Sequence, residues 1–404
     1  MALETTTTYD PILKELYVDQ RVRNLVYSQR PFFALVPKFE QAGGRNYPLP
    51  IVYGYGQGRS AVFSTAQTNT AADSNEQWTL TYTQNWGVVQ VDALLAATAK
   101  TSPQTFLPVL QARTNSVLEN LANDLGGDLF GDGFGNRAQV TGSTAGTTIT
   151  LLNTSDVTRF EVGMVITASP NADGSSPRTG TNTITAIDRN AGTLTAATAW
   201  STAITSFAAN DYMFQQGDMS SSRLKVTGLA GWGPTSAPSS TSFFGVDRTI
   251  DSRLSFVRHT GTASSLEENL IDLSYKVAEN GGMPDTVLMN YRRKASLIKQ
   301  LGSKVQYIER KVGNIGFKAV LVHGAANTDL EVYADQFCQN DRFYEIELGQ
   351  CVLVSAGMAP RIWADDGQQW LRTSSTAGME MRATVIGAQF GVQCPGKCGV
   401  STLT

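Results

Sequence analysis

Histidine and cysteine are scarce in this sequence, with two and four residues among 404, so candidates for nucleophilic or metal chemistry are few. His259 lies in a polar stretch, and His323 ends an apolar run. Neither stands near a nucleophile motif or at the spacing that a pair of metal ligands requires. The sequence therefore predicts no catalytic constellation and gives little support to an enzyme.

The four cysteines all follow residue 337, and the rest of the chain has none. This distribution does not resemble a disulfide framework. Cys338, Cys351, Cys394 and Cys398 could supply four thiolates to a zinc ion, but no CxxC pair is present. We expect reduced thiols, no metal and no cofactor.

Two other stretches suggest ligand binding but lack the spacing for it. Gly54–Gly58, GYGQG, has neither the Gly-Lys-Ser/Thr of a phosphate-binding loop nor the GxGxxG order, which favours a flexible hairpin tip. Asp128, Asp132 and Asn136 miss the DxDxDG pattern of a calcium loop, which favours a turn rich in Asp and Gly.

Basic side chains gather between residues 292 and 318, where Glu309 is the only acid. No aromatic pattern beyond Tyr291 and Tyr307 interleaves with them, so ion pairs between subunits or a solvated face are favoured over a nucleic-acid interface. A net charge of −3 also argues against a protein that neutralises nucleic acid over its whole surface. The basic residues are Arg292, Arg293, Lys294, Lys299, Lys304, Arg310, Lys311 and Lys318.

The composition, 41% hydrophobic and 17% charged, is ordinary for a soluble folded protein, and the length allows two or three domains. The N-terminus lacks the basic start and apolar run of a signal peptide. No stretch approaches about eighteen consecutive apolar residues, the length that a membrane helix needs. These features predict a protein made in a cytoplasm and kept away from membranes.

Residues 101–135 predict one long amphipathic helix, a spine for the rest of the chain, followed by a glycine-rich turn. Ser102 can cap the helix, and Pro103 suits its first turn. The residues of one face recur at three- and four-residue steps up to Gly126 and Gly127, which favour a helix end. This face comprises Leu107, Leu110, Thr114, Val117, Leu118, Leu121 and Leu125.

The first 44 residues have the pattern of an arm that docks onto another surface. Asp10-Pro11 can begin a helix that runs towards Arg30-Pro31. An apolar cluster then lies between two prolines and needs a partner surface; it comprises Phe32, Phe33, Leu35 and Val36. We expect removal of residues 1–44 to leave a folded subunit that fails to assemble.

Residues 45–95 predict a long β-hairpin with a polar tip. Pro48 and Pro50 confine the first strand to an edge, while Trp78, Leu80 and Tyr82 alternate with threonines in the second. Because a two-stranded ribbon is marginally stable alone, the missing partner of this apolar face is expected to be another subunit.

The composition changes at residue 138. Ser, Thr, Gly and Ala dominate residues 138–217, lysine is absent, and short β runs alternate with turn signals, which predicts an inserted small β-barrel or sandwich. Residues 218–360 then alternate helices and strands, as in an α+β domain. The tail, 361–404, predicts long β structure that returns to the spine helix.

Five phrases occur in order along the chain: FFALVPK, GGRNYPLPIVYG, LFGDGFGN, FFGVDRTIDSRL and LRTSSTAGMEMRATVIGAQFGVQCPGK. Together with the order of the parts, they resemble the major capsid protein of tailed bacteriophages, an α+β protein of the Hong Kong 97-type fold. The resemblance implies an N-terminal arm (1–44), an extended loop (45–95), a peripheral domain (96–137 and 361–404), an inserted β domain (138–217) and an axial domain (218–360).

The resemblance implies a structural protein whose pentamers and hexamers form an icosahedral shell around a double-stranded DNA genome. Its partners would be copies of itself, a portal, a scaffold and a decoration protein, with weak non-specific DNA contact. Virion shells of this kind are assembled in the host cytoplasm. The alternative from another class, suggested by the Thr- and Gly-rich module, is a secreted β-rich adhesin or carbohydrate-binding protein, which the missing signal peptide disfavours.

Two departures from the family matter. No long charged helical extension, which in many relatives serves as a scaffold, precedes the arm, so a scaffold encoded elsewhere or none is implied. The prototype also joins a loop lysine to an asparagine of a neighbour, but residues 45–99 contain no lysine, and Lys38 and Lys100 lie at the base of the loop. We therefore expect no covalent bond there, and a bidentate contact of Arg59 with a neighbour's carboxylate instead.

Overall fold

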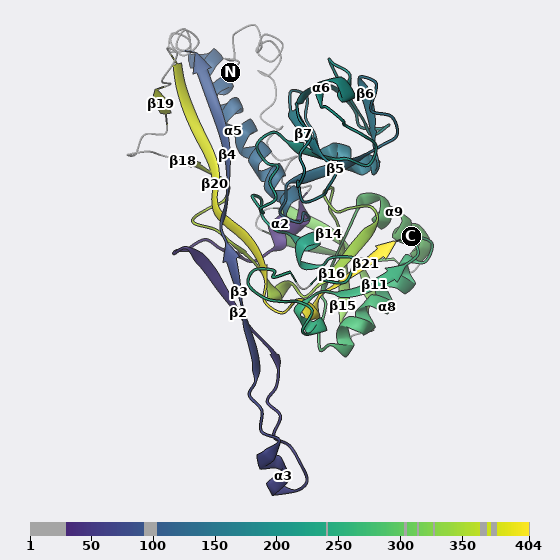
Figure 1. Cartoon of the computed structure of the whole chain (residues 1–404). Helices are drawn as coiled ribbons and strands as arrows, with labels where there is room; N and C mark the ends of the chain where they lie inside the picture. Colours follow the sequence, from purple (N-terminus) through teal and green to yellow (C-terminus); the bar gives the residue numbers. More distant parts are fainter. Residues whose placement is uncertain are drawn as a thin grey trace.

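The three-dimensional structure is a computed structural model that describes residues 30–92, 103–239, 241–302, 305–312, 315–325, 328–363, 370–372 and 378–403. A slender hairpin extends away from a body made of a long ribbon with its helix, a β-barrel and a mixed sheet (Figure 1). The helix predicted from Asp10-Pro11 and the cap predicted at Ser102 lie outside the described residues.

The predicted spine helix is confirmed as α5, Pro103–Asp128. It runs along a ribbon formed by β4, Thr83–Asp92, and β20, Gly378–Val392 (Figure 1). Gly87 permits this close approach, since a Cβ on that residue would lie 2.6 Å from a methyl carbon of Val117 on the helix. Gly126 and Gly127 lie inside the last turn, so the helix continues past the predicted end.

The ribbon belongs to a six-stranded sheet, whose other strands are β1 (Lys38–Phe39), β17 (Cys351–Val354), β18 (Arg361–Trp363) and β19 (Trp370–Arg372). Gly387 takes a φ of +65° at the bulge where β20 shifts its register against β4. Two strands of this sheet were assigned from the sequence to other parts of the chain. β4, placed in the extended loop, pairs with the tail, and β17, placed in the α+β domain, pairs with β20.

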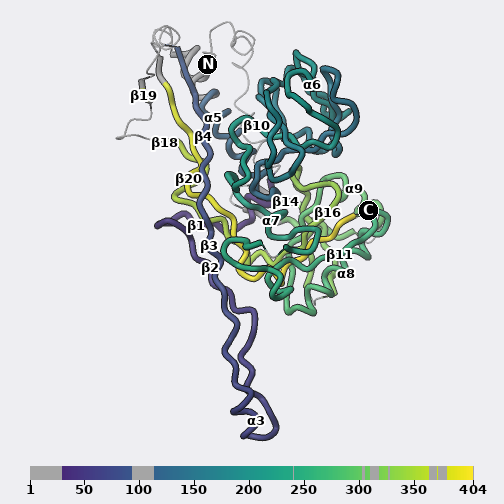
Figure 2. Tube along the Cα trace, viewed as in Figure 1, coloured from purple at the N-terminus to yellow at the C-terminus, as the bar shows by residue number. Residues whose placement is uncertain are grey.

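The predicted hairpin consists of β2, Asn46–Gly54, and β3, Ser74–Thr81, with the short helix α3, Phe63–Thr68, in its tip. The two strands form a sheet of their own. Its outer half lies alongside no other described element (Figure 2).

The predicted insertion is a closed barrel in the order β10-β5-β6-β9-β8-β7. Its core is continuous and includes Val140, Leu194, Trp200 and Met213. The first and last strands are hydrogen-bonded neighbours, with Asn136 opposite Phe214. The elements are β5 (Asn136–Thr141), β6 (Thr148–Leu151), η4 (Thr154–Arg159), β7 (Val165–Ser169), β8 (Asn182–Asp188), β9 (Thr193–Ala196), α6 (Trp200–Ala203) and β10 (Tyr212–Gln215).

Because the two ends of the barrel adjoin, we expect replacement of residues 138–217 by a short Gly/Ser linker to leave the remaining fold intact. Circular dichroism of the purified variant should retain a cooperative melt of the remaining helix and sheet signals. Global unfolding would contradict this prediction, whereas a loss of assembly alone would not.

The α+β region is built on a seven-stranded sheet in the order β11-β21-β16-β12-β15-β14-β13, with α8 and α9 packed on it (Figure 1). The two helices are α8, Leu266–Glu279, and α9, Tyr291–Leu301. The strands are β11 (Val257–Gly261), β12 (Thr286–Met289), β13 (Gln306–Val312), β14 (Ile315–His323), β15 (Asp329–Ala334), β16 (Arg342–Ile346) and β21 (Gly399–Leu403). The last of these, β21, was predicted with the tail and instead completes this sheet between β11 and β16.

The main core lies where the ribbon, the base of the hairpin and the seven-stranded sheet meet. Trp232, on the short helix α7 (Leu229–Trp232), packs against Trp78 of the hairpin and Phe243, with ring centroids 5.1 and 5.0 Å away. Three short 3-10 helices complete the described elements: η5 (Ser252–Leu254), η7 (Leu348–Gln350) and η8 (Pro395–Lys397).

Candidate assembly surfaces

The apolar cluster after Pro31 has its partner within its own chain. Residues Pro31–Leu35 form the short helix α2, on which Phe32 is 0% exposed and Phe33 and Val36 are also buried. The Phe32 ring lies 5.3 Å from that of Phe130 and 5.8 Å from that of Phe390. The expectation that the chain cannot bury this cluster alone is therefore wrong, because the end of the spine helix and β20 form a site for it.

Leu35 is partly buried and packs against the same core. The Phe32 backbone N–H faces Asp335, whose carboxylate oxygen lies 3.4 Å away, and the other oxygen accepts from Phe337 N–H at 3.0 Å. Burial raises the pKa of Asp335 to about 7, although these two N–H groups and Arg30 oppose the shift. The helix thus meets a carboxyl group that changes charge near neutral pH.

The inward face of the hairpin is likewise buried in its own subunit. Trp78 and Leu80 are both 0% exposed, and the Trp78 indole N–H donates to the Gln393 carbonyl at 3.3 Å. Tyr82 remains partly exposed, and its hydroxyl donates to the Gly43 carbonyl at 3.2 Å. The alternation in β3 indicated the buried face correctly, but the surface that covers it is intramolecular.

The hairpin tip exposes apolar side chains that no residue described by the structure covers. Tyr55 is 83% exposed and Phe63 is 77% exposed, with Val62 beside them in sequence. Backbone contacts hold the tip in shape, since Ala71 N–H donates to Gln57 O at 2.6 Å. The sequence predicts a polar tip, because these apolar residues are interspersed with Gly, Ser, Thr and Gln.

Arg59 lies exposed in the tip and forms no ion pair with any residue that the structure describes. Its predicted contact with a neighbouring carboxylate stays a prediction. Of the predicted intersubunit residues, Arg59 and Tyr82 are therefore the two that offer their side chains to solvent at the hairpin.

A second exposed apolar group lies on the ribbon, on the side of β4 opposite the spine helix. Trp86 is 45% exposed and Val88 is 47% exposed, whereas Val89 and Val91 point inward and are buried. The Trp86 ring stands 6.0 Å from that of Trp363, edge to face. We call Trp86, Val88 and Trp363 the ribbon patch. The alternation in TQNWGVVQVD could have revealed it.

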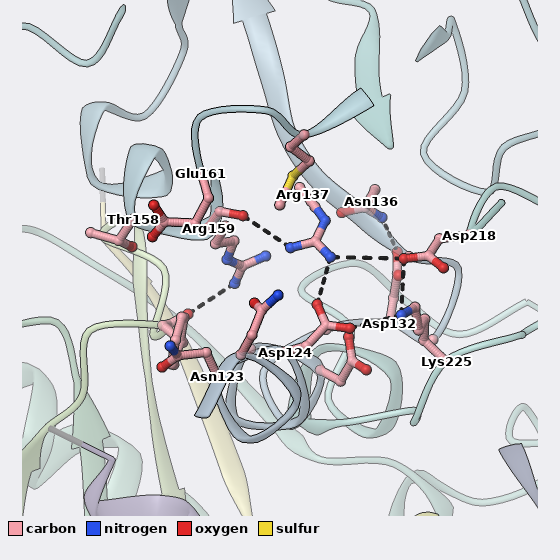
Figure 3. Close-up of a pocket in the computed structure, with 18 residues that line it drawn as sticks. Asn123, Asp124, Asp132, Asn136, Arg137, Thr158, Arg159, Glu161, Asp218 and Lys225 are labelled. Carbon is pink, nitrogen blue, oxygen red and sulfur yellow. Dashed lines mark hydrogen bonds and ion pairs between the residues drawn. The ribbon is translucent and has the colours of Figure 1, made fainter. Parts of the chain in front are cut away.

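A cluster of charges joins the barrel to the spine helix (Figure 3). Asp124 of the helix accepts from Arg137 of β5 at 2.5 Å and from Lys225, which follows the barrel, at 2.8 Å. Asp218 lies 2.9 Å from the same ammonium group and 3.8 Å from the Arg137 guanidinium. These groups and Asp128 line a cavity of about 50 Å³.

The charges balance when Asp128 keeps its proton. Burial alone would raise the pKa of Asp124, but Arg137 and Lys225 outweigh it and hold that pKa well below its usual range. Burial and then the charge of Asp124 raise the pKa of Asp128 to about 8. Two carboxylates, Asp124 and Asp218, then face two cations, an arrangement suited to fixing the barrel rather than to catalysis.

A proton on Asp128 makes stability depend on pH. Between about pH 4 and 8 the unfolded chain ionises this carboxyl while the folded chain keeps it neutral, so the stabilisation present at low pH is lost as pH rises. The unfolding free energy of the wild type should fall from pH 5 to pH 8. Because Asp128→Asn cannot ionise at this position, its unfolding free energy should fall by about 1–3 kcal/mol less over the same range. Urea unfolding of unassembled subunits at both pH values measures this, with the exposed Asp247→Asn as control. Parallel pH profiles for wild type and Asp128→Asn would contradict it.

The basic side chains after residue 291 that the structure describes are largely used within the chain. Arg292 donates to the Thr154 hydroxyl of the barrel at 2.8 Å, Arg293 to Asn340 O at 2.7 Å, and Lys294 to Lys318 O at 2.9 Å. Lys304 and the side chains of Arg310 and Lys311 lie outside the described residues. These contacts favour a structural role over a nucleic-acid interface.

The remaining candidates for chemistry do not converge. His259 contacts Lys276, 2.9 Å from its Nδ1, whereas His323 pairs with Asp329 at 2.5 Å on the surface. Cys338 lies apart from the other cysteines, with its thiol towards Leu288 O. Among the described side chains, no group of three or more His, Cys, Asp or Glu residues is arranged to hold a metal ion. No helix in the described ranges is long and apolar enough to cross a membrane.

No protein-family model and no curated protein matches the chain. Solved structures do resemble it. The capsid asymmetric unit of cyanophage A-1(L) matches with a TM-score of 0.51 and 10% sequence identity, over 96% of this chain and 97% of that one. The fold is the Hong Kong 97-type capsid fold.

Two other solved structures match over nearly the whole chain with lower TM-scores. The capsid of Myoviridae phage XM1 has a TM-score of 0.47 at 9% identity and covers 93% of this chain and 92% of its own. The holo-SrpI encapsulin complex from Synechococcus elongatus PCC 7942 has a TM-score of 0.46 at 9% identity, with 100% and 96% covered. In this chain, the closed barrel lies in sequence between α5 and the seven-stranded sheet.

Proposed function

We propose that the chain is a major capsid protein, whose pentamers and hexamers form an icosahedral shell around the double-stranded DNA of a tailed phage. The supporting observation is the likeness of fold to the cyanophage A-1(L) capsid, which extends over 96% of this chain. The role is structural, and a net charge of −3 suits a wall that contains DNA without binding it tightly. Portal and scaffold proteins complete the partners of such a shell, and assembly takes place in the host cytoplasm.

The exposed apolar surfaces support assembly through the hairpin. Tyr55, Val62 and Phe63 at the tip and the ribbon patch are exposed apolar groups among the described residues, on two elements that lie far apart in one subunit (Figure 2). We propose that the tip of one subunit packs on the ribbon patch of the next. Such a contact is heterologous, and a heterologous contact repeated around an axis closes a ring.

Electron microscopy of the purified full-length chain tests the function. We expect closed shells of uniform diameter, which a secreted adhesin or carbohydrate-binding protein would not form. Discrete monomers at all concentrations, combined with binding to a glycan array, would overturn the proposal in favour of the adhesin. Phe63→Ala is expected to reduce shell yield and leave subunit stability unchanged, which tests the tip contact separately.

We expect that no covalent bond links neighbouring subunits through the hairpin. The loop offers Arg45 and Arg59 but no lysine, and a guanidinium remains protonated and does not act as a nucleophile. Boiled and reduced shells should therefore run as one band near 43.5 kDa on a denaturing gel. A ladder of higher bands would show a covalent link.

A further inference from the structure

Three of the four cysteines meet where the two large sheets join. Cys351 is the first residue of β17 in the six-stranded sheet, and Cys398 directly precedes β21 of the seven-stranded sheet. Cys394 and Cys398 flank the single turn of η8, Cys394 before it and Cys398 after it. The function proposed above uses none of these thiols.

The local backbone holds Cys351 and Cys398 against each other. Gln393 N–H donates to Gln350 O at 2.9 Å, which places the start of the η8 turn beside the start of β17. The turn then closes through a 2.9 Å hydrogen bond from Cys398 N–H to Pro395 O. Both thiols are buried in the main core, where the Cys351 thiol adjoins that of Cys398 and faces the Glu347 carbonyl oxygen 4.0 Å away.

We propose that Cys351 and Cys398 are a site of disulfide formation, and that Cys394 is the thiol through which a small-molecule disulfide oxidant enters. Cys394 is the one of the four cysteines that is not fully buried, and the Lys397 ammonium beside it favours its thiolate. The inference concerns the subunit itself and stands whether or not subunits form a shell.

The reaction proceeds by three exchanges that balance. The Cys394 thiolate attacks oxidised glutathione, forms a mixed disulfide and releases one glutathione thiol. Cys398 then attacks the Cys394 sulfur, forms a Cys394–Cys398 disulfide and releases the second glutathione thiol. Cys351 finally attacks Cys398, forms the Cys351–Cys398 disulfide and returns Cys394 to the thiol. In sum, two protein thiols are oxidised, and one glutathione disulfide is reduced to two thiols.

Burial governs the rate of these steps. The hydrogen bond to Cys398, and then burial, raise the pKa of the Cys351 thiol well above its ordinary value, and burial raises that of Cys394. Little thiolate is present at neutral pH, so the site oxidises slowly, and the redox poise of a reducing cytoplasm keeps it reduced. The product would tie the last strand of one sheet to a strand of the other and close the chain between them.

The sequence permits an unambiguous assay of the pairing. Trypsin cleaves after Arg342, Arg361, Arg382 and Lys397, so the three cysteines fall on three separate peptides: 343–361, 383–397 and 398–404. Purified full-length protein is incubated at pH 8 with oxidised glutathione, quenched with N-ethylmaleimide under denaturing conditions, digested without reductant and examined by mass spectrometry. We expect peptide 343–361 linked to peptide 398–404, and no glutathione adduct at completion.

The variants separate the roles of the three thiols. Cys351→Ser is expected to stop at the link between peptides 383–397 and 398–404, and Cys394→Ser to form the final link about tenfold more slowly. Cys338→Ser, which alters a buried cysteine away from the site, should behave as the wild type. The melting temperature should rise on oxidation of the wild type and of Cys338→Ser but not of Cys351→Ser.

Three results would overturn the inference. A wild-type product that ends as a Cys394–Cys398 link, or as a glutathione adduct of Cys394, would show that Cys351 does not take part. An unmodified wild-type protein after days of incubation would show that the buried thiols are inert. Equal rates for wild type and Cys394→Ser would remove the entry role from Cys394.

Discussion

Unassembled subunits with Phe32→Ala are expected to lose about 3–5 kcal/mol of unfolding free energy. Phe32 is 0% exposed between Phe130 and Phe390, so alanine would leave a cavity beside the end of the spine helix. The short helix that carries Phe32 has five residues and depends on this side chain for its place in the core. Urea unfolding followed by tryptophan fluorescence measures the loss.

Phe63→Ala is the matched control, because that phenylalanine is 77% exposed at the hairpin tip. We expect its unfolding free energy to stay within about 0.5 kcal/mol of the wild type. If Phe32→Ala were instead as stable as the wild type and defective only in assembly, the prediction would be wrong, and Phe32 would have the intersubunit role that the sequence pattern suggests.

The same reasoning changes the expected result of truncating the N-terminus. Removal of residues 1–44 would take away Phe32, Phe33 and Val36 and expose their site in the main core. A destabilised subunit is therefore expected, in place of the folded and assembly-defective subunit that the sequence alone predicts. Removal of residues 1–29 spares the site and is the sharper way to ask what the preceding segment does.

Local patterns predicted most elements because each depends on nearby residues. The period of the spine helix and the alternation in β3 were both visible in the sequence. Pairing between distant segments was not. β17 was expected in the α+β domain and pairs with β20 of the tail, whereas β21 was expected with the tail and pairs with β16 of the α+β domain. The sequence of a short apolar strand indicates that the strand is buried but does not identify the strand beside it.

The candidate surfaces show the same limit. The apolar clusters at Phe32 and Trp78 were recognised as buried faces, but only the fold shows that their partners are Phe390 and Trp232 of the same chain. The charged cluster was not foreseen, because Asp124 and Lys225 are separated by the whole barrel in sequence. An inserted domain brings its two flanking segments together in space, and no local sequence pattern predicts which of their residues then meet.

That cluster gives the second large expected effect. Asp124→Ala should lower the unfolding free energy by about 3–5 kcal/mol at pH 7, the usual cost of removing one partner from a buried ion pair. Asp124 accepts hydrogen bonds from Asn85 of β4 at 2.6 Å, from Arg137 of the barrel and from Lys225. Its removal leaves the two buried cations, Arg137 and Lys225, with Asp218 and Asp128 beside them, and releases three segments at once.

The unfolding free energy that Asp124→Ala loses should be smaller at acidic pH. Because Arg137 and Lys225 hold the pKa of Asp124 below its ordinary value, its stabilising effect is complete above about pH 4 and declines as pH falls from there. Urea unfolding of wild type and variant at pH 7 and pH 3 should therefore show the larger difference at pH 7. Glu161→Ala is the matched control, since its pair with Arg189 in the same barrel is exposed and worth about 0.5 kcal/mol or less.

A second substitution distinguishes lost charge balance from lost packing. Lys225→Met in the Asp124→Ala background removes one of the two cations and leaves one carboxylate, Asp218, opposite one guanidinium, Arg137. The double variant should be more stable than the sum of the two single losses implies, by about 1–3 kcal/mol. Strictly additive losses would mean that the aspartate and the lysine act independently, and that the barrel is held to the spine helix by its apolar contacts and not by this cluster.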